Sequence, residues 1–353
     1  MASSSLPINL ALQGGGSHGA LAWGVIDRLL EEKHLHFPEV SGTSAGAMNA
    51  AVLAHGLALG GRDGAKQALR QFWKAVSDAA RFSPIQRSLW DRMQGNYTLD
   101  NSPGYLIMSG LSQILPPQVL NPLDYNPLRN LVEAMIDFDA INASKQVRLH
   151  LTATNVRTGQ ARIFSTGEIS VDSVMASACL PQMYRAVEID GEAYWDGGFS
   201  ANPALKPLAV DSPTRDLLIL NLNPLRRNEL PRTARDIINR VNEISFNTSL
   251  IKELKSLDQL RQLRDAGTLA LDESADLRLH MIHCETDVQE LSASSKLNAE
   301  WRYLQHLFER GRIWAQDWLD QNLEKVGRQS SFLLDEFFQQ AQLPKALAPL
   351  REA

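Results

Sequence analysis

The stretch Gly42-Thr43-Ser44-Ala45-Gly46 decides the fold, because it places a serine between two glycines, each two residues away. This G-x-S-x-G pattern is typical of a nucleophile elbow, in which a strand turns sharply into a helix and leaves the serine hydroxyl exposed. Gly42 and Gly46 suit such a turn because a Cβ there would collide with a neighbouring strand or helix. The flanks agree with this interpretation, since residues 37–41 can form a strand and residues 45–54 a helix of small side chains.

A second glycine-rich turn lies upstream. Residues 8–12 predict a short apolar strand that runs into Gly14-Gly15-Gly16-Ser17-His18-Gly19. The helix expected over about residues 20–32 has apolar side chains at spacings of three and four, and a further helix is expected over residues 63–80. A strand, helix, strand, helix order predicts parallel strands in a doubly wound sheet. The fold class is therefore α/β, with a largely parallel sheet flanked by helices.

Composition indicates a soluble globular protein. The 353 residues are 44% hydrophobic and 21% charged, and the net charge of −5 does not favour nucleic acid as a partner. No run approaches the roughly 18 apolar residues that span a bilayer, and the first residues lack the features of a signal peptide. The two cysteines, Cys179 and Cys284, suit a reducing cytosol. We expect a cytoplasmic protein that reaches any lipid peripherally, from the water side.

The expected domain organisation is an α/β domain over residues 1–290 and a helical C-terminal extension over residues 291–353 packed on it. Residues 82–144 hold six of the sixteen prolines, which predicts short helices and loops. Either a surface insertion or a cap over the active site fits this stretch. A helix is expected over residues 296–326, and its apolar stripe indicates packing in the core or against another subunit, which leaves a homodimer open.

The upstream glycine turn has two functional interpretations. Its G-x-G-x-x-G spacing matches the dinucleotide fingerprint, which also needs an acidic residue at the end of the second strand to hold a ribose. That strand ends in Ser41-Gly42, whereas Glu31 and Glu32 belong to the end of the helix, so the second anchor is missing. The other interpretation is an oxyanion hole, whose amide donors are worth roughly 3–4 kcal/mol each in acyl transfer. A plain structural turn capped by Ser17 is the third alternative.

A nucleophilic serine needs a base, and two residues are candidates. His18 lies in the glycine turn itself, whereas the other histidines lie away from the expected position of Ser44. Residues 187–195 resemble a hairpin that turns at Asp190-Gly191. Asp196 follows this hairpin and precedes Gly197-Gly198, as a strand end that breaks into a turn would. We take Asp196 as the stronger candidate. A carboxylate is a poor base in water, but desolvation makes it a better one.

The three motifs, in this order, resemble the patatin-like phospholipase family. The stretches 176–181 and 187–191 also resemble the sequence that precedes the family's Asp-Gly-Gly. The resemblance covers about residues 8 to 205, and the region after residue 220 matches less clearly. One departure is that His18 stands where the family usually carries Arg or Lys, which leaves open how the glycine turn is braced.

The resemblance implies a three-layer α/β/α fold and a dyad without histidine. Ser44 would be the nucleophile and Asp196 would take its proton. Gly15 and Gly16 would supply the oxyanion donors, with Gly14 shaping the turn. The supporting residues would be His18, Gly42, Gly46, Gly197 and Gly198. Neither a cofactor nor a metal is implied.

The function that follows is a lipid acyl hydrolase of the phospholipase A, lysophospholipase or esterase type, which works through an acyl-enzyme. The expected partner is a lipid or long-chain ester, with transient contact at a membrane surface. The alternatives are an acyl thioesterase or polyester hydrolase on the same dyad, an NAD(P)-binding protein that uses Gly14–Gly19, and a non-catalytic binding module.

Overall fold

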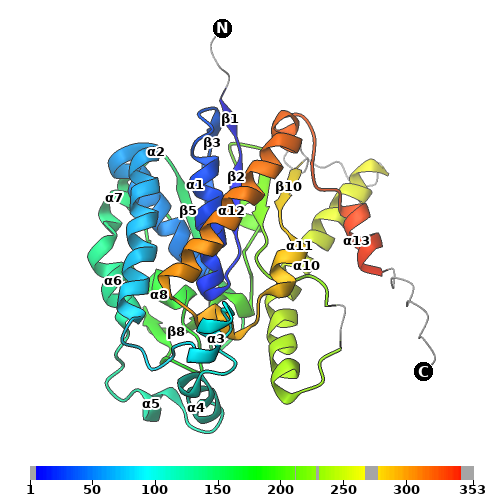
Figure 1. Cartoon of the computed structure of the whole chain (residues 1–353). Helices are drawn as coiled ribbons and strands as arrows, with labels where there is room; N and C mark the ends of the chain where they lie inside the picture. Colours follow the sequence, from blue (N-terminus) through cyan, green and yellow to red (C-terminus); the bar gives the residue numbers. More distant parts are fainter. Residues whose placement is uncertain (1–4, 211, 228–229, 267–276, 343–353) are drawn as a thin grey trace, which may run out of the picture.

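The computed structural model describes residues 5–210, 212–227, 230–266 and 277–342. An eight-stranded sheet forms its centre, in the order β10-β9-β2-β4-β5-β8-β7, with β6 paired to β5 (Figure 1). The strands are β2 (Asn9–Leu12), β4 (Glu39–Thr43), β5 (Arg148–Asn155), β6 (Ala161–Ser165), β7 (Val187–Ile189), β8 (Glu192–Asp196), β9 (Asp216–Leu220) and β10 (Arg278–Ile282). β1 (Leu6–Pro7) and β3 (Leu35–His36) form a separate two-stranded sheet.

The sheet is parallel in its centre and antiparallel at one edge. β10, β9, β2, β4 and β5 run parallel to one another, whereas β6 and β8 each pair with β5 in the antiparallel direction. The expected hairpin with its turn at Asp190-Gly191 is present as β7 and β8. A largely parallel sheet is thus confirmed, with a mixed edge that the sequence pattern did not specify.

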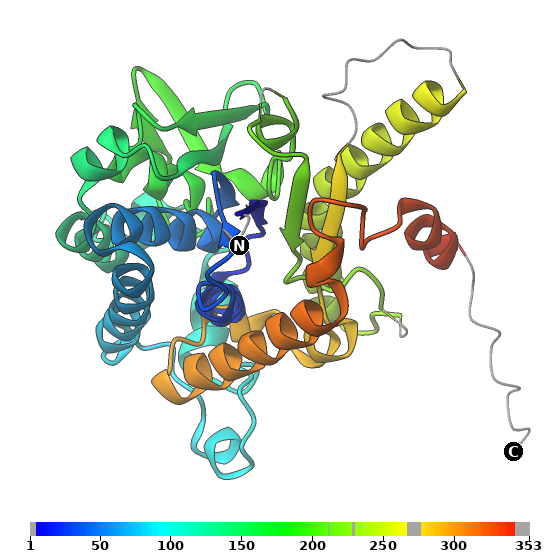
Figure 2. The same cartoon turned by 90° about the horizontal axis from the view of Figure 1, so that it is seen from above.

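Helices cover both faces of the sheet. They are α1 (Gly19–Leu29), α2 (Ala45–Ala80), α8 (Val171–Ser177), α9 (Lys206–Ala209), α10 (Ala234–Asp265), α11 (Glu285–Glu290), α12 (Trp301–Asn322) and α13 (Leu334–Gln342). Short 3₁₀ turns are η1 (Gly16–His18), η2 (Gly197–Phe199), η4 (Ser294–Leu297) and η5 (Leu323–Lys325). Figure 2 shows α12 in orange beside the dark blue α1, which it packs against.

Successive side chains along the buried strands belong to two different hydrophobic clusters. Leu10 and Leu12 of β2 belong to the cluster that contains α1, α2 and α12. Ala11, between them, belongs to a second cluster with Leu250 and Leu254 of α10. Because side chains along a strand alternate between faces, β2 is buried on both sides. The result is the expected three-layer α/β/α arrangement.

The chain reverses its direction of travel across the sheet at β2. From β2 it moves through β4 to β5 on one side, and it returns later to place β9 and then β10 on the other side. In open parallel sheets, ligands bind outside the carboxyl ends of the strands at such a switch point. The glycine-rich turn leaves β2 at that place, as the sequence led us to expect.

Several expected helices differ in extent from the observed ones. The helices expected over residues 45–54 and 63–80 form the single element α2, which is interrupted at Gly61 with φ 61° and ψ −149°. The helix expected from residue 296 begins at Trp301, because residues 294–297 form the tighter turn η4. The sequence interpretation missed α10 entirely. Residues 343–353 of the expected C-terminal extension lie outside the described residues.

The proline-rich stretch folds as short helices, which we call the cap. They are α3 (Leu89–Met93), α4 (Pro103–Leu111), α5 (Pro117–Leu120), α6 (Pro127–Met135) and α7 (Phe138–Ala143). Three of them, α4, α5 and α6, have proline in the first turn, where the missing N–H costs no hydrogen bond. Among the residues that the structure describes, no helix combines the length and apolar character needed to cross a lipid bilayer.

The elbow glycine Gly46 should not tolerate a side chain. A Cβ at this position would overlap the Leu12 carbonyl and lie 3.0 Å from the Gln13 oxygen, and neither backbone atom can move without shifting β2. We therefore expect Gly46→Ala to lower the free energy of unfolding by at least about 2 kcal/mol in urea denaturation. Gly110→Ala is the matched control, since a Cβ on this exposed α4 glycine meets nothing within 4 Å. Equal stability of the two variants would contradict the close approach of α2 to β2.

Candidate active site

Strand register brings three turns together at the carboxyl edge of the sheet. Leu12 pairs with Gly42, so the residues two positions further on, Gly14 and Ser44, leave the sheet side by side. On the other side of β4, Thr43 pairs with Thr152 of β5. The next residue of β5, Ala153, pairs with Asp196. The glycine turn, the serine and the aspartate therefore all lie at one edge of neighbouring strands.

Ser44 occupies a strained turn between β4 and α2. Its φ of 56° and ψ of −122° are unusual for a residue with a side chain. Such outliers are found mostly at functional sites, where the surrounding structure holds them. The Ser44 N–H donates to Ser177 Oγ at 3.0 Å, and Ser44 stands at the N-terminus of α2. The helix dipole there favours negative charge on or near the serine.

The glycine turn packs directly on the serine. A Cβ built on Gly14 would lie 2.7 Å from the Ser44 Cβ, so only glycine leaves room for this contact. The Gly14 N–H donates to Asn202 Oδ1 at 2.7 Å, and the Gly14 carbonyl accepts from Asn223 Nδ2 at 3.0 Å. Gly14 is therefore fixed on both sides. Within the described parts of the chain, the amides of Gly15 and Gly16 have no hydrogen-bond partner.

Asp196 ends β8 and is completely buried. Its Oδ1 accepts from the Gly198 N–H at 2.7 Å. Its Oδ2 makes no hydrogen bond of normal distance and angle with any residue that the structure describes. The Ser44 hydroxyl nevertheless lies near enough to lower the pKa of the carboxyl, as a weak hydrogen bond would. The structure thus brings Ser44 and Asp196 together and leaves one carboxylate oxygen without a strong partner.

Burial sets the protonation behaviour of this aspartate. The loss of hydration raises the pKa of Asp196 from 3.8 to about 6, although hydrogen bonds from Ser44 and Gly198 and the charge of Lys296 oppose the shift. A carboxylate with a raised pKa holds a proton more firmly than one in water, so it is a better general base near neutral pH.

His18 does not face the serine. Its Nε2 pairs with Ser295 Oγ at 2.8 Å, and the same hydroxyl accepts from Tyr303 Oη at 3.0 Å. Burial, together with the charges of Lys296 and Arg227, holds the pKa of the imidazole well below its usual value, so the ring is neutral. The alternative in which His18 serves as the base gains no support from this geometry.

Four residues around the turns were not predicted from the sequence as part of the site. They are Ser177, Asn202, Asn223 and Lys296. Ser177 lies in the stretch that resembled the family, and Asn202 lies close behind Asp196 in the chain, so both could have been suspected. Asn223 and Lys296 lie far away in sequence, and no local pattern pointed to them.

A cavity of about 550 Å³ lies between the cap and the β7–β8 hairpin. Its lining includes Asp124 and Arg129 from the cap, with Cys179 and Tyr184 from the segment before the hairpin. The Cys179 carbonyl accepts from the Asp196 N–H at 2.8 Å, so the cavity adjoins the aspartate. Its volume is in the range of ligand sites, and it borders the candidate dyad.

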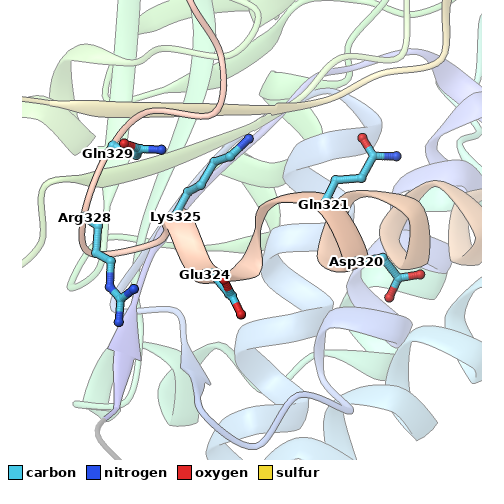
Figure 3. Close-up of a pocket in the computed structure, with 6 residues that line it drawn as sticks. All are labelled: Asp320, Gln321, Glu324, Lys325, Arg328 and Gln329. Atoms are coloured by element: carbon cyan, nitrogen blue, oxygen red, sulfur yellow. The ribbon is translucent and has the colours of Figure 1, made fainter.

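A second hollow of about 370 Å³ lies elsewhere, at the end of α12 (Figure 3). The side chains around it come from residues 320–329, and Figure 3 shows them extending in different directions. Gly327, in this segment, donates its N–H to Asp216 at the start of β9. The hollow therefore lies at the amino edge of the sheet, away from Ser44, and we do not regard it as the active site.

Comparison with known proteins finds the same family that the three sequence motifs resemble. The family model described as patatin-like phospholipase matches residues 10–209, which is more than half of the chain. No curated protein matches the sequence. VipD from Legionella pneumophila is 17% identical, with a TM-score of 0.37, over 86% of this chain and 66% of that one.

The type III effector ExoU gives similar values, with 17% identity and a TM-score of 0.33 over 90% of this chain and 54% of that one. ExoU in its complex with SpcU from Pseudomonas aeruginosa has 17% identity and a TM-score of 0.30, over 96% of this chain and 76% of that one. This chain thus spans about two thirds of the VipD chain and about half of the chain in the first ExoU structure. The assignment rests on the family model and not on these TM-scores. The protein belongs to the patatin-like phospholipase family.

Proposed function

We propose that the protein is a lipid acyl hydrolase in which Ser44 is the nucleophile and Asp196 the general base. Membership of the family supports hydrolysis of lipid esters in general. The observation that carries the dyad is the buried Asp196 carboxylate, whose Oδ2 lacks a strong partner beside the strained Ser44. A buried carboxylate oxygen without a strong hydrogen bond costs stability, and such a cost is expected where the group has a chemical task.

Acylation begins when the substrate carbonyl lies between Ser44 and the glycine turn. Asp196 accepts the Ser44 hydroxyl proton while Ser44 Oγ forms a bond to the carbonyl carbon. The carbonyl oxygen becomes an oxyanion, to which the free amides of Gly15 and Gly16 donate. Collapse of this intermediate breaks the bond to the leaving alcohol, which takes the proton from Asp196 and departs.

In deacylation, water is the nucleophile and Ser44 Oγ is the leaving group. Asp196 accepts a proton from water, and the water oxygen attacks the acyl carbon. The bond between Ser44 Oγ and the acyl group breaks, and Ser44 regains its proton from Asp196. The same steps would cleave a thioester or a polyester, so the dyad alone leaves these substrates as alternatives.

The cap favours a lipid over a small soluble ester. It exposes many large apolar side chains, which we call the cap surface. Its members are Phe82, Leu89, Trp90, Met93, Leu106, Ile107, Leu111, Ile114, Val119 and Leu123. Figure 1 places α3, α4 and α5 at the end of the molecule opposite the N-terminus, which is the end that carries Ser44.

Many exposed large apolar side chains within one segment are typical of a surface that contacts lipid or protein. The amino-terminal part of α10, which carries the exposed apolar residues Ile237, Val241 and Ile244, lies at the same end of the molecule (Figure 1). We propose that these surfaces rest on a lipid bilayer and present the active site to it.

Loss of either dyad residue should abolish turnover. We expect Ser44→Ala and Asp196→Asn to lower kcat/KM for a medium-chain nitrophenyl ester by about 10³-fold or more. A fluorophosphonate probe should label the wild type and not Ser44→Ala. Ser41→Ala is the matched control, because this β4 hydroxyl is buried without a partner among the described residues. Full activity of Ser44→Ala would contradict the nucleophile, and an active Asp196→Asn with an inactive His18→Ala would reassign the base.

The raised pKa of Asp196 predicts opposite effects of pH on activity and stability. Acylation requires the ionised carboxylate, so kcat/KM should rise with pH through about 6. Folding favours the neutral form, so the stability from Asp196 is complete below 3.8 and is lost as pH rises through 6.

Replacement of Asp196 by asparagine removes the free-energy cost of burying a charged carboxylate. Asp196→Asn should exceed the wild type in free energy of unfolding at pH 8 by on the order of 2 to 3 kcal/mol. At pH 4 the difference should be small. Urea denaturation at both pH values measures it, and an Asp196→Asn variant less stable than the wild type at pH 8 would contradict the burial of a charged carboxylate.

Contact with a bilayer should depend on the cap surface. Trp90→Asp with Met93→Asp introduces two charges into that surface, which disfavours insertion into lipid. We expect co-sedimentation with phosphatidylcholine vesicles to fall at least about 5-fold, and hydrolysis of vesicle lipid to fall more than hydrolysis of a soluble ester. Arg157→Asp, on the exposed β5–β6 turn, serves as the control for added charge. Equal vesicle binding by the two variants would exclude the cap surface as the contact.

A further inference from the structure

Lys296 lies against the glycine turn although it is remote from it in sequence. It belongs to η4, which lies three residues before α12 and beyond the residues 10–209 that match the family. A Cβ on Gly16 would overlap the Lys296 carbonyl and lie 3.2 Å from the Lys296 Cβ. The lysine backbone thus forms one wall of the turn, and its side chain is partly buried there.

A chain of hydrogen bonds links the Lys296 ammonium to the turn. Lys296 Nζ donates to Asn223 Oδ1 at 2.6 Å. Asn223 Nδ2 in turn donates to the Gly14 carbonyl at 3.0 Å. The Asn223 backbone is itself held, because its N–H donates to Gln13 Oε1 at 3.0 Å. The ammonium group therefore acts on the Gly14 carbonyl through one intervening side chain.

The Gly14 carbonyl and the Gly15 N–H belong to one planar peptide group. In a trans peptide these two bonds point in opposite directions. A donor that fixes the carbonyl on one side therefore fixes the direction of the N–H on the other. Successive hydrogen bonds also polarise one another, most strongly when a charged donor starts the chain.

We propose that Lys296 is a positioning residue of the active site, which acts through Asn223 to orient and polarise the Gly14–Gly15 peptide. The Gly15 N–H then becomes a stronger and better aimed donor to the oxyanion. This inference rests on the proposed hydrolase function and adds a positive charge to its oxyanion loop. Position 18 supplies none, because the buried His18 ring is neutral.

Several charged groups face the ammonium from the surrounding elements. Glu243 of α10 and Asp196 of β8 stabilise its charge, whereas Arg227 destabilises it. Arg227 is itself bound to Glu243, with Nη2 and Oε1 2.6 Å apart. Burial, followed by the charge of Arg227, lowers the pKa of Lys296 to about 8. The charge is therefore present at neutral pH and is lost as pH rises through about 8.

The test compares Lys296→Met and Lys296→Arg with the wild type on a soluble ester. Lys296→Met should lower kcat by about 10-fold or more, with KM changed less than about 3-fold, because the oxyanion exists only after binding. Lys296→Arg should retain most of the activity. Lys325→Met is the matched control, since Lys325 Nζ also donates to an asparagine, Asn322 Oδ1 at 2.8 Å, but at the other edge of the sheet. It should change kcat less than about 2-fold.

The pH profile separates this role from a merely structural one. The wild-type kcat should fall as pH rises through about 8. Lys296→Arg should remove that fall, since arginine keeps its charge, and Lys296→Met should give a low rate without an alkaline fall. Asn223→Leu should also lower kcat, and adding Lys296→Met to it should cost little more, because both changes break one chain.

Two results would overturn the proposal. One is a Lys296→Met protein that is folded by circular dichroism and keeps wild-type kcat. The other is a Lys296→Arg protein that retains the alkaline fall near 8, and this result decides the matter if Lys296→Met does not fold. Failure of the hydrolase function is distinct, because the wild type would then neither hydrolyse esters nor react with a fluorophosphonate, and both proposals would fall.

Discussion

The hydrogen-bonded register between β2, β4 and β5 is the constraint on which the rest of the site depends. It sets Leu12 beside Gly42 and Thr43 beside Thr152, and the antiparallel pairing of β5 with β8 then sets Ala153 beside Asp196. A slip of one residue in any pair would turn side chains to the opposite face of the sheet and bury polar groups in the two apolar layers. The core that stabilises the fold therefore also aligns the three turns.

Within that frame, the candidate site holds groups in states that folding alone would not favour. Ser44 has a left-handed φ, Asp196 is buried with one oxygen lacking a strong partner, and Lys296 keeps an ammonium group away from most of the solvent. Each has a cost, and the surrounding sheet and helices offset it through ordinary apolar packing. The aspartate and the lysine also oppose one another in charge, so each moderates the desolvation of the other.

Local patterns in the sequence predicted the parts of this arrangement that local geometry determines. The elbow around Ser44, the strand before Gly14 and the hairpin before Asp196 each have glycines or apolar alternation at a short, recognisable spacing. The cap was expected as short helices because proline blocks longer ones. Helix α10 was missed because its exposed isoleucines and many charges obscure a clear apolar stripe. Asn223 and Lys296 could not be predicted, since their roles arise from tertiary contacts with a turn far away in the chain. The domain boundaries, and the roles of the site residues, stay predictions.

The packing of η4 on the glycine turn has a consequence for biosynthesis. β2, β4 and the serine elbow lie within residues 9–46, but Ser295 and Lys296, which contact His18 and Gly16, are translated much later. A nascent chain that has already formed β2 and β4 on the ribosome therefore lacks one wall of the turn. On this view the glycine turn reaches its final form only after residues 294–297 have been made, long after β2 and β4.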